Sequence, residues 1–387
     1  MNTEKVIKRD QKYIMHTYAR SPLVLEHGEG MYAYDADGKA YLDFTSGIGV
    51  NALGYCHPAW VQAVTMQATR LQHSSNLYYT APCGKLAKRL CARTGLDQVF
   101  FGNSGAEANE GAIKCARKYS VTTYGPDRNK VLTLVNSFHG RTLATLTATG
   151  QEVFHNYFGP FNEGFQYVPA GDLEALTELV DRHTCAVMLE LVQGEGGVVA
   201  LEPEYVQAVR KLCDDRDLVL IVDEVQTGNG RTGSLYAYMQ YGISPDIVTT
   251  AKGLGNGLPI GATMFSAKCE KTLTPGTHGS TFGGNPVACA GAIAVIKAIN
   301  DKLLSGVAEK GERIRGVLSV CSKVKSVSGL GLMLGVEADD AAALKEQCLQ
   351  KGLVVLTAKD KLRLLPPLNI GDDELEEGLR ILKEVLG

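Results

Sequence analysis

Hydrophobic and polar residues alternate in regular blocks through the middle of the chain, and these blocks predict both helices and strands. Stretches with helical spacing lie at 106–119, 173–182 and 204–216, and 286–300 predicts a long apolar helix. Short runs of aliphatic and β-branched residues lie between them, at 131–135, 186–191, 218–222, 247–250 and 262–265. Helices that alternate with fully apolar strands predict a mainly parallel sheet with helices on both faces.

The two ends of the chain have shorter elements. Near the N-terminus, the runs 30–35 and 40–44 predict two strands joined at the turn Asp37-Gly38. Two helices should follow, at 58–72 and 83–93. Toward the C-terminus the pattern predicts helices at 303–318, 340–351 and 373–386, and strands at 324–328, 332–337, 353–356 and 363–365.

These patterns predict an α/β protein with two domains. The large domain should cover residues 48–300 and contain the mainly parallel sheet. A smaller α/β domain should cover residues 301–387, and the N-terminal segment, residues 1–47, should join it.

Composition narrows the possible functions. Of the 387 residues, 45% are hydrophobic and 21% are charged, as in ordinary globular proteins. The formal net charge of −3 gives no reason to expect binding to nucleic acid or to an anionic membrane. No apolar run is long enough to span a bilayer, and the first ten residues lack the apolar core of a secretion signal. We therefore expect a cytoplasmic protein.

The ten cysteines do not form a recognisable site. None belongs to a C-x-x-C pair, and most lie in apolar surroundings. We expect reduced, mostly buried thiols rather than a disulfide framework or a metal site.

Three of the apolar runs end in charged residues. Glu190 follows one run, Asp223-Glu224 follows the next, and Lys252 ends the run at 247–250 after one alanine. The carboxyl ends of parallel strands form the ligand crevice of an open α/β sheet. Each charge alone could be the solvated end of a strand. An acid and a lysine followed by Gly253-Leu254-Gly255-Asn256-Gly257 favour a functional crevice.

Lys252 is the strongest candidate for a nucleophile. A partly buried lysine amine is more easily neutral, and only the neutral amine attacks a carbonyl. Asp223 lies one strand–helix–strand step earlier in the chain. A carboxylate at that place could hold a proton on the nitrogen of a pyridine ring, which would then withdraw electrons. Alternatively, Asp223 and Lys252 could form a plain salt bridge.

A candidate anion site lies at Ser104-Gly105-Ala106, where a flexible turn opens a helix. The free N–H groups and the dipole of a helix N-terminus suit a phosphate. Ser104 and Glu107 also have the S-x-x-E spacing of a capping box, so an ordinary helix start remains an alternative. The segment 278–286 offers hydroxyls and glycines before another helix.

Three further residues suit a planar cofactor and an anionic substrate. Phe138 could stack on a ring, and Arg141 could clamp a carboxylate. Arg363 is a lone cation in an apolar run and could also bind a carboxylate. Alternatively, it is an ordinary strand residue whose guanidinium group extends to solvent.

Several motifs in order resemble the class-III, fold-type I aminotransferases, which use pyridoxal 5′-phosphate (PLP), and within them the acetylornithine aminotransferases. The resemblance covers nearly the whole chain. Its motifs are Tyr18-Ala19-Arg20-Ser21-Pro22-Leu23, Asp37-Gly38-Lys39-Ala40-Tyr41-Leu42-Asp43-Phe44, Phe101-Gly102-Asn103-Ser104-Gly105-Ala106-Glu107-Ala108-Asn109-Glu110, Phe138-His139-Gly140-Arg141-Thr142, Gln193-Gly194-Glu195-Gly196-Gly197, Asp223-Glu224-Val225-Gln226-Thr227-Gly228, Ala251-Lys252-Gly253, Ser280-Thr281-Phe282-Gly283-Gly284-Asn285-Pro286 and Arg363-Leu364-Leu365-Pro366-Pro367.

The resemblance implies a role for each matching residue. Lys252 would bind PLP covalently and act as the general base, and Asp223 would pair with the pyridine nitrogen. The remaining cofactor contacts would come from Ser104, Gly105, Ala106, Phe138, Glu224, Val225, Gln226 and, from the partner subunit, Thr281. Substrate carboxylates would be held by Arg141 and Arg363, with Ser280, Tyr18 and Glu195 nearby. Glu195 would neutralise Arg363 whenever an amino group approaches.

The implied reaction moves the terminal amine of N2-acetyl-L-ornithine to 2-oxoglutarate, in a homodimer with a shared active site. Ornithine, succinylornithine, N-succinyl-diaminopimelate and 4-aminobutyrate are alternative donors on the same scaffold, and a glutamate-1-semialdehyde aminomutase is a further relative. A third possibility is a non-catalytic α/β protein that binds a phosphorylated ligand through the turn at Ser104.

Overall fold

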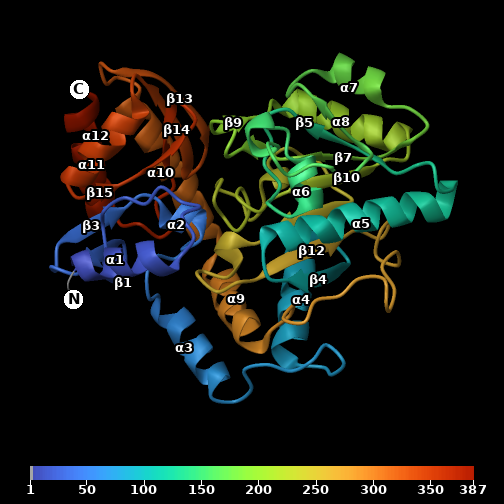
Figure 1. The fold of residues 1–387 in the computed structure, drawn as a ribbon, viewed down its shortest axis with the longest axis horizontal. Helices are drawn as coiled ribbons and strands as arrows, with labels where there is room; N and C mark the ends of the chain where they lie inside the picture. Colours follow the sequence, from blue (N-terminus) through green and yellow to red (C-terminus); the bar gives the residue numbers. More distant parts are fainter. Residues whose placement is uncertain (1–2) are drawn as a thin grey trace.

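The computed structural model describes residues 3–387 and has two lobes (Figure 1). The larger lobe is built on a seven-stranded sheet with the order β4-β12-β11-β10-β7-β5-β6. Its strands are β4 (Gln98–Gly102), β5 (Lys130–Leu134), β6 (Phe165–Val168), β7 (Thr184–Leu189), β10 (Val219–Asp223), β11 (Ile247–Thr250) and β12 (Gly261–Phe265).

The sheet is mainly parallel, which confirms the fold class expected from the sequence. Strands β6, β5, β7, β10 and β11 are parallel neighbours, whereas β12 runs antiparallel to both β11 and β4. The five strands from β12 to β5 are buried along their whole length. Burial on both faces explains why their sequences are continuous apolar runs rather than alternating ones.

Helices cover both faces of this sheet (Figure 1). They are α4 (Ala81–Thr94), α5 (Gly105–Tyr124), α6 (Leu143–Ala148), α7 (Leu173–Leu179), α8 (Pro203–Asp215) and α9 (Pro286–Ala298). Helix α3 (Pro58–Ala68) lies farther from the sheet and packs against α9 (Figure 1). Proline opens α3, α8 and α9 at a first-turn position, where its missing N–H costs no hydrogen bond. Side-chain caps from Ser104 and Asn285 fix the starts of α5 and α9.

The smaller lobe combines both ends of the chain. One four-stranded sheet has the order β13-β14-β17-β16, with β13 (Val324–Leu330), β14 (Met333–Ala338), β16 (Leu356–Ala358) and β17 (Lys361–Leu364). A second has the order β1-β2-β3-β15, with β1 (Leu25–Glu29), β2 (Tyr32–Asp35), β3 (Ala40–Asp43) and β15 (Leu353–Val354). The flanking helices are α1 (Thr3–Tyr13), α2 (Ser46–Gly49), α10 (Asp301–Leu318), α11 (Ala341–Gln350) and α12 (Asp372–Leu386).

The pairing of β3 with β15 ties the N-terminal strands to the C-terminal part of the chain. Leu42 lies opposite Leu353 in parallel register. The N–H of Leu42 donates to Gly352 O, and the N–H of Phe44 donates to Val354 O. The N-terminal segment therefore completes a sheet of the smaller lobe.

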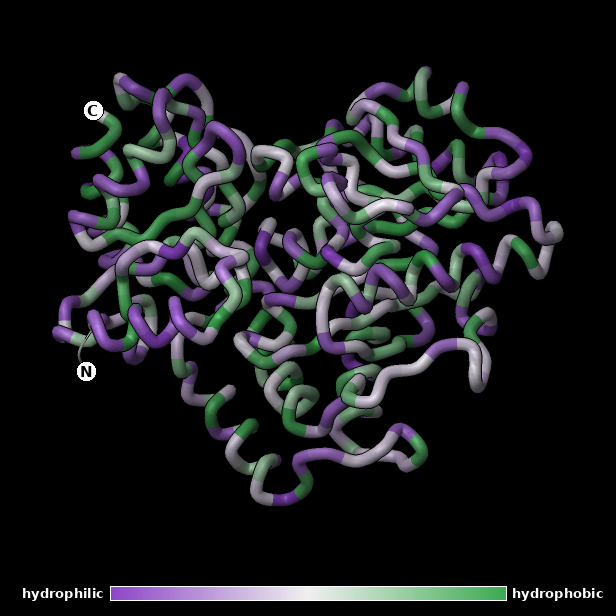
Figure 2. Tube along the Cα trace, viewed as in Figure 1, coloured by the Kyte–Doolittle hydropathy of each residue, from purple (hydrophilic) through white to green (hydrophobic). Residues whose placement is uncertain are grey.

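Two large hydrophobic clusters form the core. One, from Leu53 to Ile299, lies on one face of the seven-stranded sheet, and the other joins residues 31–52 to residues 307–386. A smaller cluster packs α5 against the opposite face of the seven-stranded sheet. Figure 2 shows the strands inside both lobes mostly in the hydrophobic colours, with hydrophilic residues frequent along the outer segments.

The sequence pattern missed several short or edge elements, among them α1, α6, β4 and β6. Helix α1 has no buried residue, and its mostly polar sequence predicts an irregular segment. Helix α6 has only six residues, too few for a clear period. Strand β4 has an exposed or half-buried first part, and β6 lies at the sheet edge with half of its residues exposed. Short or edge elements leave a weak hydrophobic pattern.

Three other features of the described residues bear on function. All ten cysteines have free thiols, and Cys56 alone among them is exposed. Within residues 3–387, no helix is long and apolar enough to cross a membrane. In the same part of the chain, no cluster of histidine, cysteine or carboxylate side chains could hold a metal ion.

In the smaller lobe, the substitution of a helical glycine by alanine should change the stability of the protein in opposite directions at two positions. A Cβ atom on Gly378 would lie 2.2 Å from Cζ of the fully buried Phe44. Gly378→Ala should therefore destabilise the protein by about 1–3 kcal/mol, as overpacking does. A Cβ atom on Gly316 in α10 meets nothing within 4 Å, so Gly316→Ala should stabilise the protein by about 0.5–1 kcal/mol. Urea unfolding of both variants checks the pair; equal shifts in unfolding free energy would contradict this account of the packing.

Candidate active site

The charged residues expected at strand ends meet at one edge of the large sheet. Asp223 is the last residue of β10, Glu190 directly follows the neighbouring β7, and Lys252 follows β11 on the other side of β10 after Ala251. The register pairs Val222 with Leu189 and Asp223 with Thr249, so the three strands end at nearly the same level. The edge therefore gathers two acids and a lysine in one crevice.

Asp223 is buried and held by several donors. Its Oδ2 accepts a hydrogen bond from Asn109 Nδ2 at 2.7 Å and lies 2.8 Å from His139 Nδ1. Its Oδ1 accepts the N–H of Val225 at 3.0 Å. Donors of this kind stabilise a buried carboxylate in its charged form. Asp223 is thus fixed in position.

Lys252 has an amine without a partner of its own. Among the described residues, its Nζ makes no hydrogen bond and no ion pair, and Asp223 is not bonded to it. The alternative of a plain salt bridge is therefore wrong. The residue is half-buried, and its backbone lies in the left-handed region, with φ of 43°. Such strain in a non-glycine residue is typical of functional sites.

The surroundings of Lys252 favour the neutral amine. Enclosure by protein lowers the pKa of Lys252 below its ordinary value, and the positive charge of Arg363 acts in the same direction. The carboxylates of Glu195, Asp223 and Glu190 oppose this effect without cancelling it. A lysine with a lowered pKa is a better nucleophile and base near neutral pH.

The turn at Ser104 opens α5 as expected. Ser104 Oγ accepts the N–H of Glu107 at 3.1 Å. The carboxylate of Glu107 accepts instead from the N–H and the side-chain amide of Asn103, one residue before the position that a capping box requires. The N–H groups of Gly105 and Ala106 have no acceptor in the described chain, so they are available to an anion.

Val225 packs directly against this turn. A Cβ atom on Gly105 would lie 2.6 Å from Val225 Cγ1, so only glycine lets the turn approach the end of β10 so closely. Glu224 has a different environment. Its buried carboxylate accepts the N–H of Tyr238 and the hydroxyl of Thr227.

Phe138 and Arg141 lie on the loop after β5. The N–H of Phe138 donates to Glu190 Oε1 at 2.8 Å, which ties the loop to the end of β7. The exposed Arg141 guanidinium lies 4.1 Å from the centre of the Phe154 ring and 5.5 Å from that of Phe138. Within the described residues it has no carboxylate partner, so it remains free to bind one.

Arg363 is paired across the two lobes. It lies on β17 of the smaller lobe, is 3% exposed, and its Nη1 donates to Glu195 Oε1 at 2.6 Å. The same Nη1 reaches Gln226 Oε1 at 3.3 Å. Burial pushes the pKa of Glu195 upward, but the charge and hydrogen bond of Arg363 outweigh it and hold the pKa below its ordinary value. Arg363 is therefore not a snorkelling residue.

The remaining candidates lie at the surface. Ser280 Oγ accepts a hydrogen bond from Asn103 Nδ2 at 3.1 Å, which brings the segment 278–286 to the start of α5. Thr281 is exposed, and its side chain has no hydrogen-bond partner in residues 3–387. Tyr18 is 74% exposed on the N-terminal segment, and the centre of its ring lies 5.7 Å from the guanidinium carbon of Arg20. The structure does not bring Thr281 or Tyr18 into contact with Asp223 or Lys252 of the same chain.

The crevice fits PLP by the chemistry of its groups. The two unpaired N–H groups at Gly105 and Ala106 suit the phosphate, and the clamped carboxylate of Asp223 suits a protonated ring nitrogen. The unpaired amine of Lys252 suits the carbonyl carbon. An aromatic ring, Phe138, is available on the neighbouring loop.

Sequence reasoning missed the residues that hold Asp223. Asn109 donates to both Asp223 and the backbone oxygen of His139, and Thr249 Oγ1 donates to Asn109 Oδ1. An asparagine on the buried, mostly apolar face of α5 is the signal that could have revealed this network, because a buried amide needs polar partners.

Comparison with known proteins agrees with this geometry. Residues 13–386 match the sequence profile of the class-III aminotransferases. The acetylornithine aminotransferase of Haemophilus ducreyi is 53% identical and covers 100% of this chain and 99% of its own. A structure of the ornithine aminotransferase from Toxoplasma gondii, with partial occupancy of PLP at its active site, superposes with a TM-score of 0.95 at 34% identity, covering 100% of this chain and 94% of that one. The acetylornithine aminotransferase from Elizabethkingia anophelis superposes with a TM-score of 0.89 at 31% identity, covering 100% and 99%.

The buried carboxylate of Glu224 should make the unfolding free energy of the protein depend on pH. Burial raises its pKa to about 7, above that of an unfolded glutamate, although its hydrogen bonds to Thr227 and Tyr238 oppose the rise. The folded protein therefore keeps this proton between about pH 4.5 and 7, while the unfolded chain loses it, and stability falls as the pH rises through that window. Glu224→Gln cannot ionise, so it should gain about 1–3 kcal/mol relative to the native protein between pH 5 and pH 8.

Urea unfolding of both proteins at the two pH values measures this change. Glu204→Gln on the exposed side of α8 is a control and should show no such gain. A difference between Glu224→Gln and the native protein that stays constant from pH 5 to pH 8 would show that Glu224 titrates normally.

Proposed function

Because the chain belongs to the class-III aminotransferases, we propose that it transfers the terminal amino group of N2-acetyl-L-ornithine to 2-oxoglutarate. The products are N-acetyl-L-glutamate 5-semialdehyde and L-glutamate, and the reaction is a step of arginine biosynthesis. Similarity to the acetylornithine aminotransferase of Haemophilus ducreyi over the full chain supports this donor. The observation that carries the chemistry is the crevice in which a fixed carboxylate, Asp223, and an unpaired amine, Lys252, end neighbouring strands.

PLP, the cofactor of this family, supplies a carbonyl for amino exchange and a ring that withdraws electrons. Lys252 would hold the cofactor covalently, and its neutral amine would take a proton from the substrate carbon and return one at the neighbouring position. Asp223, held by Asn109 and His139, would keep a proton on the ring nitrogen. The N–H groups of Gly105 and Ala106 and the hydroxyl of Ser104 would hold the phosphate.

The paired Arg363 and Glu195 let one site accept two different substrates. With the ion pair closed, the positive charge of Arg363 is neutralised, and the uncharged chain of an ω-amine donor can approach. When 2-oxoglutarate binds, its 1-carboxylate replaces Glu195 at Arg363, and Arg141 holds the distal carboxylate. The free guanidinium edge of Arg363 supports this role, since its buried Nε has no partner among the described residues.

Other amine donors share the same scaffold. The similarity to the Toxoplasma gondii ornithine aminotransferase favours ornithine as the second candidate. Succinylornithine, N-succinyl-diaminopimelate and 4-aminobutyrate differ from these donors mainly at the end far from the reacting amine, so contacts around Arg141 decide among them.

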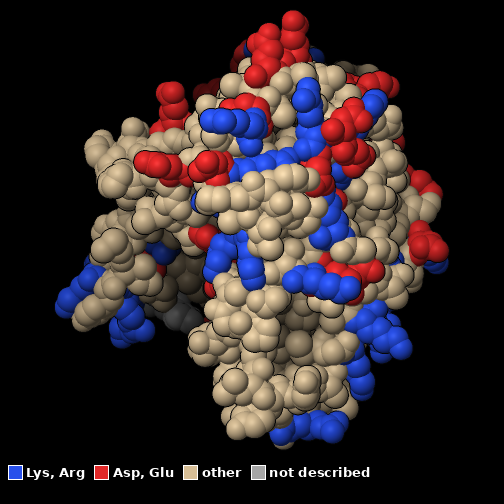
Figure 3. Space-filling model, turned by 90° about the vertical axis from the view of Figure 1, so that its right-hand side faces the viewer, with Lys and Arg blue, Asp and Glu red and all other residues tan. Residues whose placement is uncertain are grey.

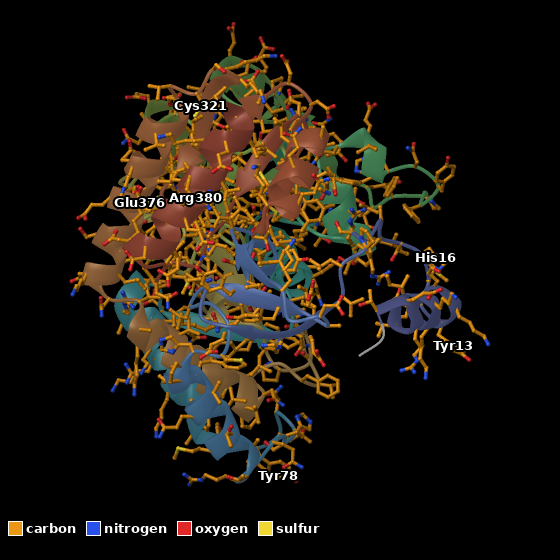
Figure 4. The ribbon with its side chains drawn as sticks, turned by 90° about the vertical axis from the view of Figure 1, so that its left-hand side faces the viewer. Tyr13, His16, Tyr78, Cys321, Glu376 and Arg380 are labelled. Carbon is orange, nitrogen blue, oxygen red and sulfur yellow. The ribbon has the colours of Figure 1, made fainter. Side chains whose placement is uncertain are left out.

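The exposed apolar surface supports a homodimer. Large hydrophobic side chains are exposed on the N-terminal segment (Tyr13, Met15 and Tyr18) and on the loop after α3 (Leu77, Tyr78 and Tyr79). Figure 4 shows Tyr13, His16 and Tyr78 on parts that project from the body of the molecule. Apolar patches of this kind mark protein interfaces.

The dimer also accounts for the placement of Thr281. Asn76 donates to Ser280 O and Gly283 O, both at 2.9 Å, so the loop after α3 and the segment that carries Thr281 lie on one surface. We propose that Thr281 completes the phosphate site of the partner subunit and that Tyr18 approaches the substrate there.

Two expectations from the sequence stay predictions. The domain division at residues 1–47, 48–300 and 301–387 is consistent with the two hydrophobic clusters. A cytoplasmic location fits a biosynthetic aminotransferase.

Borohydride trapping tests the cofactor and its lysine together. Protein saturated with PLP should be yellow, and borohydride should bleach it and fix the cofactor to Lys252, as peptide mass mapping would show. Lys252→Ala should lose the label and at least about 10³-fold in kcat with N2-acetyl-L-ornithine and 2-oxoglutarate, because it removes both the covalent anchor and the base. Lys211→Ala, an exposed lysine on α8, serves as the control. Label at a different lysine, or turnover in Lys252→Ala, would disprove the assignment.

Glu195→Gln tests the paired charges. Without the carboxylate, nothing neutralises the positive charge of Arg363 when the aliphatic chain of the amine donor approaches. The kcat/KM for N2-acetyl-L-ornithine should therefore fall about tenfold or more. For L-glutamate in the reverse half-reaction, the competing carboxylate is gone, and KM should fall or stay unchanged. Stopped-flow half-reactions with each amine measure the two values, and Glu202→Gln is an exposed control. Equal losses with both amines would argue against this role.

A further inference from the structure

A second cavity lies at the opposite edge of the large sheet from the catalytic crevice. It has a volume of about 610 Å³ and is lined by residues that precede or begin β5, β7 and β10, among them Arg128, His183 and Leu218. Asp223 and Glu190 follow the other ends of β10 and β7. Strands of five or six residues separate the two edges by about 17–20 Å. The cavity is therefore no part of the proposed active site.

The lining of the cavity carries an excess of positive charge. Three guanidinium groups, Arg128, Arg182 and Arg216, lie there with two carboxylates, Asp127 and Asp181. Asp181 is already neutralised by Lys130, whose Nζ lies 2.9 Å from its Oδ2. Because Lys130 already balances Asp181, the three guanidinium groups of the lining face only one uncompensated carboxylate, that of Asp127. Figure 3 looks onto the side of the molecule where α5 ends, and Lys and Arg side chains gather across its middle.

Arg128 is fixed in place without a carboxylate partner. Its Nε donates to Thr184 O at 2.9 Å, and its Nη2 donates to Arg216 O and Asp217 O at 2.7 and 3.0 Å. Its guanidinium carbon lies 3.9 Å from the centre of the Tyr124 ring. The carboxylate of Asp217 is itself bound by Lys268, Tyr119 and Tyr124. Nothing among the described residues neutralises Arg128.

The other two guanidinium groups are also uncompensated. Arg182 Nε donates to His183 Nε2 at 3.1 Å, and His183 Nδ1 lies 2.9 Å from Asp127 O, so Arg182 has no carboxylate partner among the described residues. The side chain of Arg216 has no hydrogen-bond or ion-pair partner within residues 3–387. Both groups keep their terminal N–H donors free for a ligand.

We infer that this cavity binds a small multivalent anion with phosphate or carboxylate groups, as a second ligand site separate from catalysis. Pre-placed guanidinium groups recognise both kinds of oxyanion in bidentate fashion. The volume suits a small molecule rather than a single ion. Val180 and Leu218 line part of the cavity, so the ligand can also carry an apolar portion.

Calorimetric titration of the PLP-loaded enzyme at low ionic strength tests the inference. The probes are inorganic phosphate, citrate and, as a monovalent comparison, acetate. Binding of phosphate or citrate with a Kd of about 1 mM or tighter, and at least tenfold weaker binding of acetate, is expected. Binding of phosphate alone identifies the ligand class as a phosphate compound, and binding of citrate alone identifies it as a polycarboxylate. If neither binds, the inference is wrong.

Variants assign the binding to this cavity rather than to Arg363 or Arg141. The double substitution Arg182→Ala with Arg216→Ala should weaken the anion at least tenfold. Arg89→Ala, which removes an exposed arginine of α4, should leave binding unchanged. Arg182 and Arg216 are both exposed, so the double variant should fold normally, and its melting temperature without anion provides the check. Undiminished affinity in the folded double variant would place the anion elsewhere and overturn the proposal.

Discussion

The fixed carboxylate of Asp223 is the interaction on which the rest of the site depends. A carboxylate that is 3% exposed is stable only if donors surround it, and here they come from three different parts of the fold. Asn109 belongs to α5, His139 follows β5, and the N–H of Val225 belongs to the turn after β10. Satisfying one acid therefore fixes the start of α5, the loop with Phe138 and the end of β10 relative to one another. The geometry proposed for the cofactor is a consequence of that arrangement.

Much of this could be predicted from the sequence because it follows from local pattern. The buried strands β5, β7, β10 and β11 are long apolar runs, and Asp223 and Lys252 stand out as charges at their ends. The hydrogen bonds that hold Asp223 could not be predicted in the same way. Asn109 and Asp223 are 114 residues apart, and no periodicity links an amide inside a helix to a carboxylate at a strand end. The antiparallel direction of β12 and the shift of the Glu107 bond to Asn103 likewise depend on tertiary contacts.

The ion pair of Arg363 with Glu195 connects chemistry to the arrangement of the two lobes. Arg363 lies on a strand of the smaller lobe, whereas Glu195 follows β8 (Val192–Gln193) close to the catalytic edge. Because the pair crosses between the lobes, any ligand that replaces Glu195 also changes what holds them together. Selection between substrates is thus coupled to the packing of the smaller lobe against the larger one.

The pairing of β3 with β15 has a consequence for synthesis of the chain. Leu42 and its partner Leu353 are 311 residues apart, so the N-terminal sheet cannot be completed until almost the whole polypeptide has left the ribosome. At about 5–20 residues per second, this strand waits roughly 15–60 s for its partner. During that time the seven-stranded sheet, whose residues lie between 98 and 265, can form first. The order of translation therefore gives the catalytic edge a scaffold before the two ends of the chain meet.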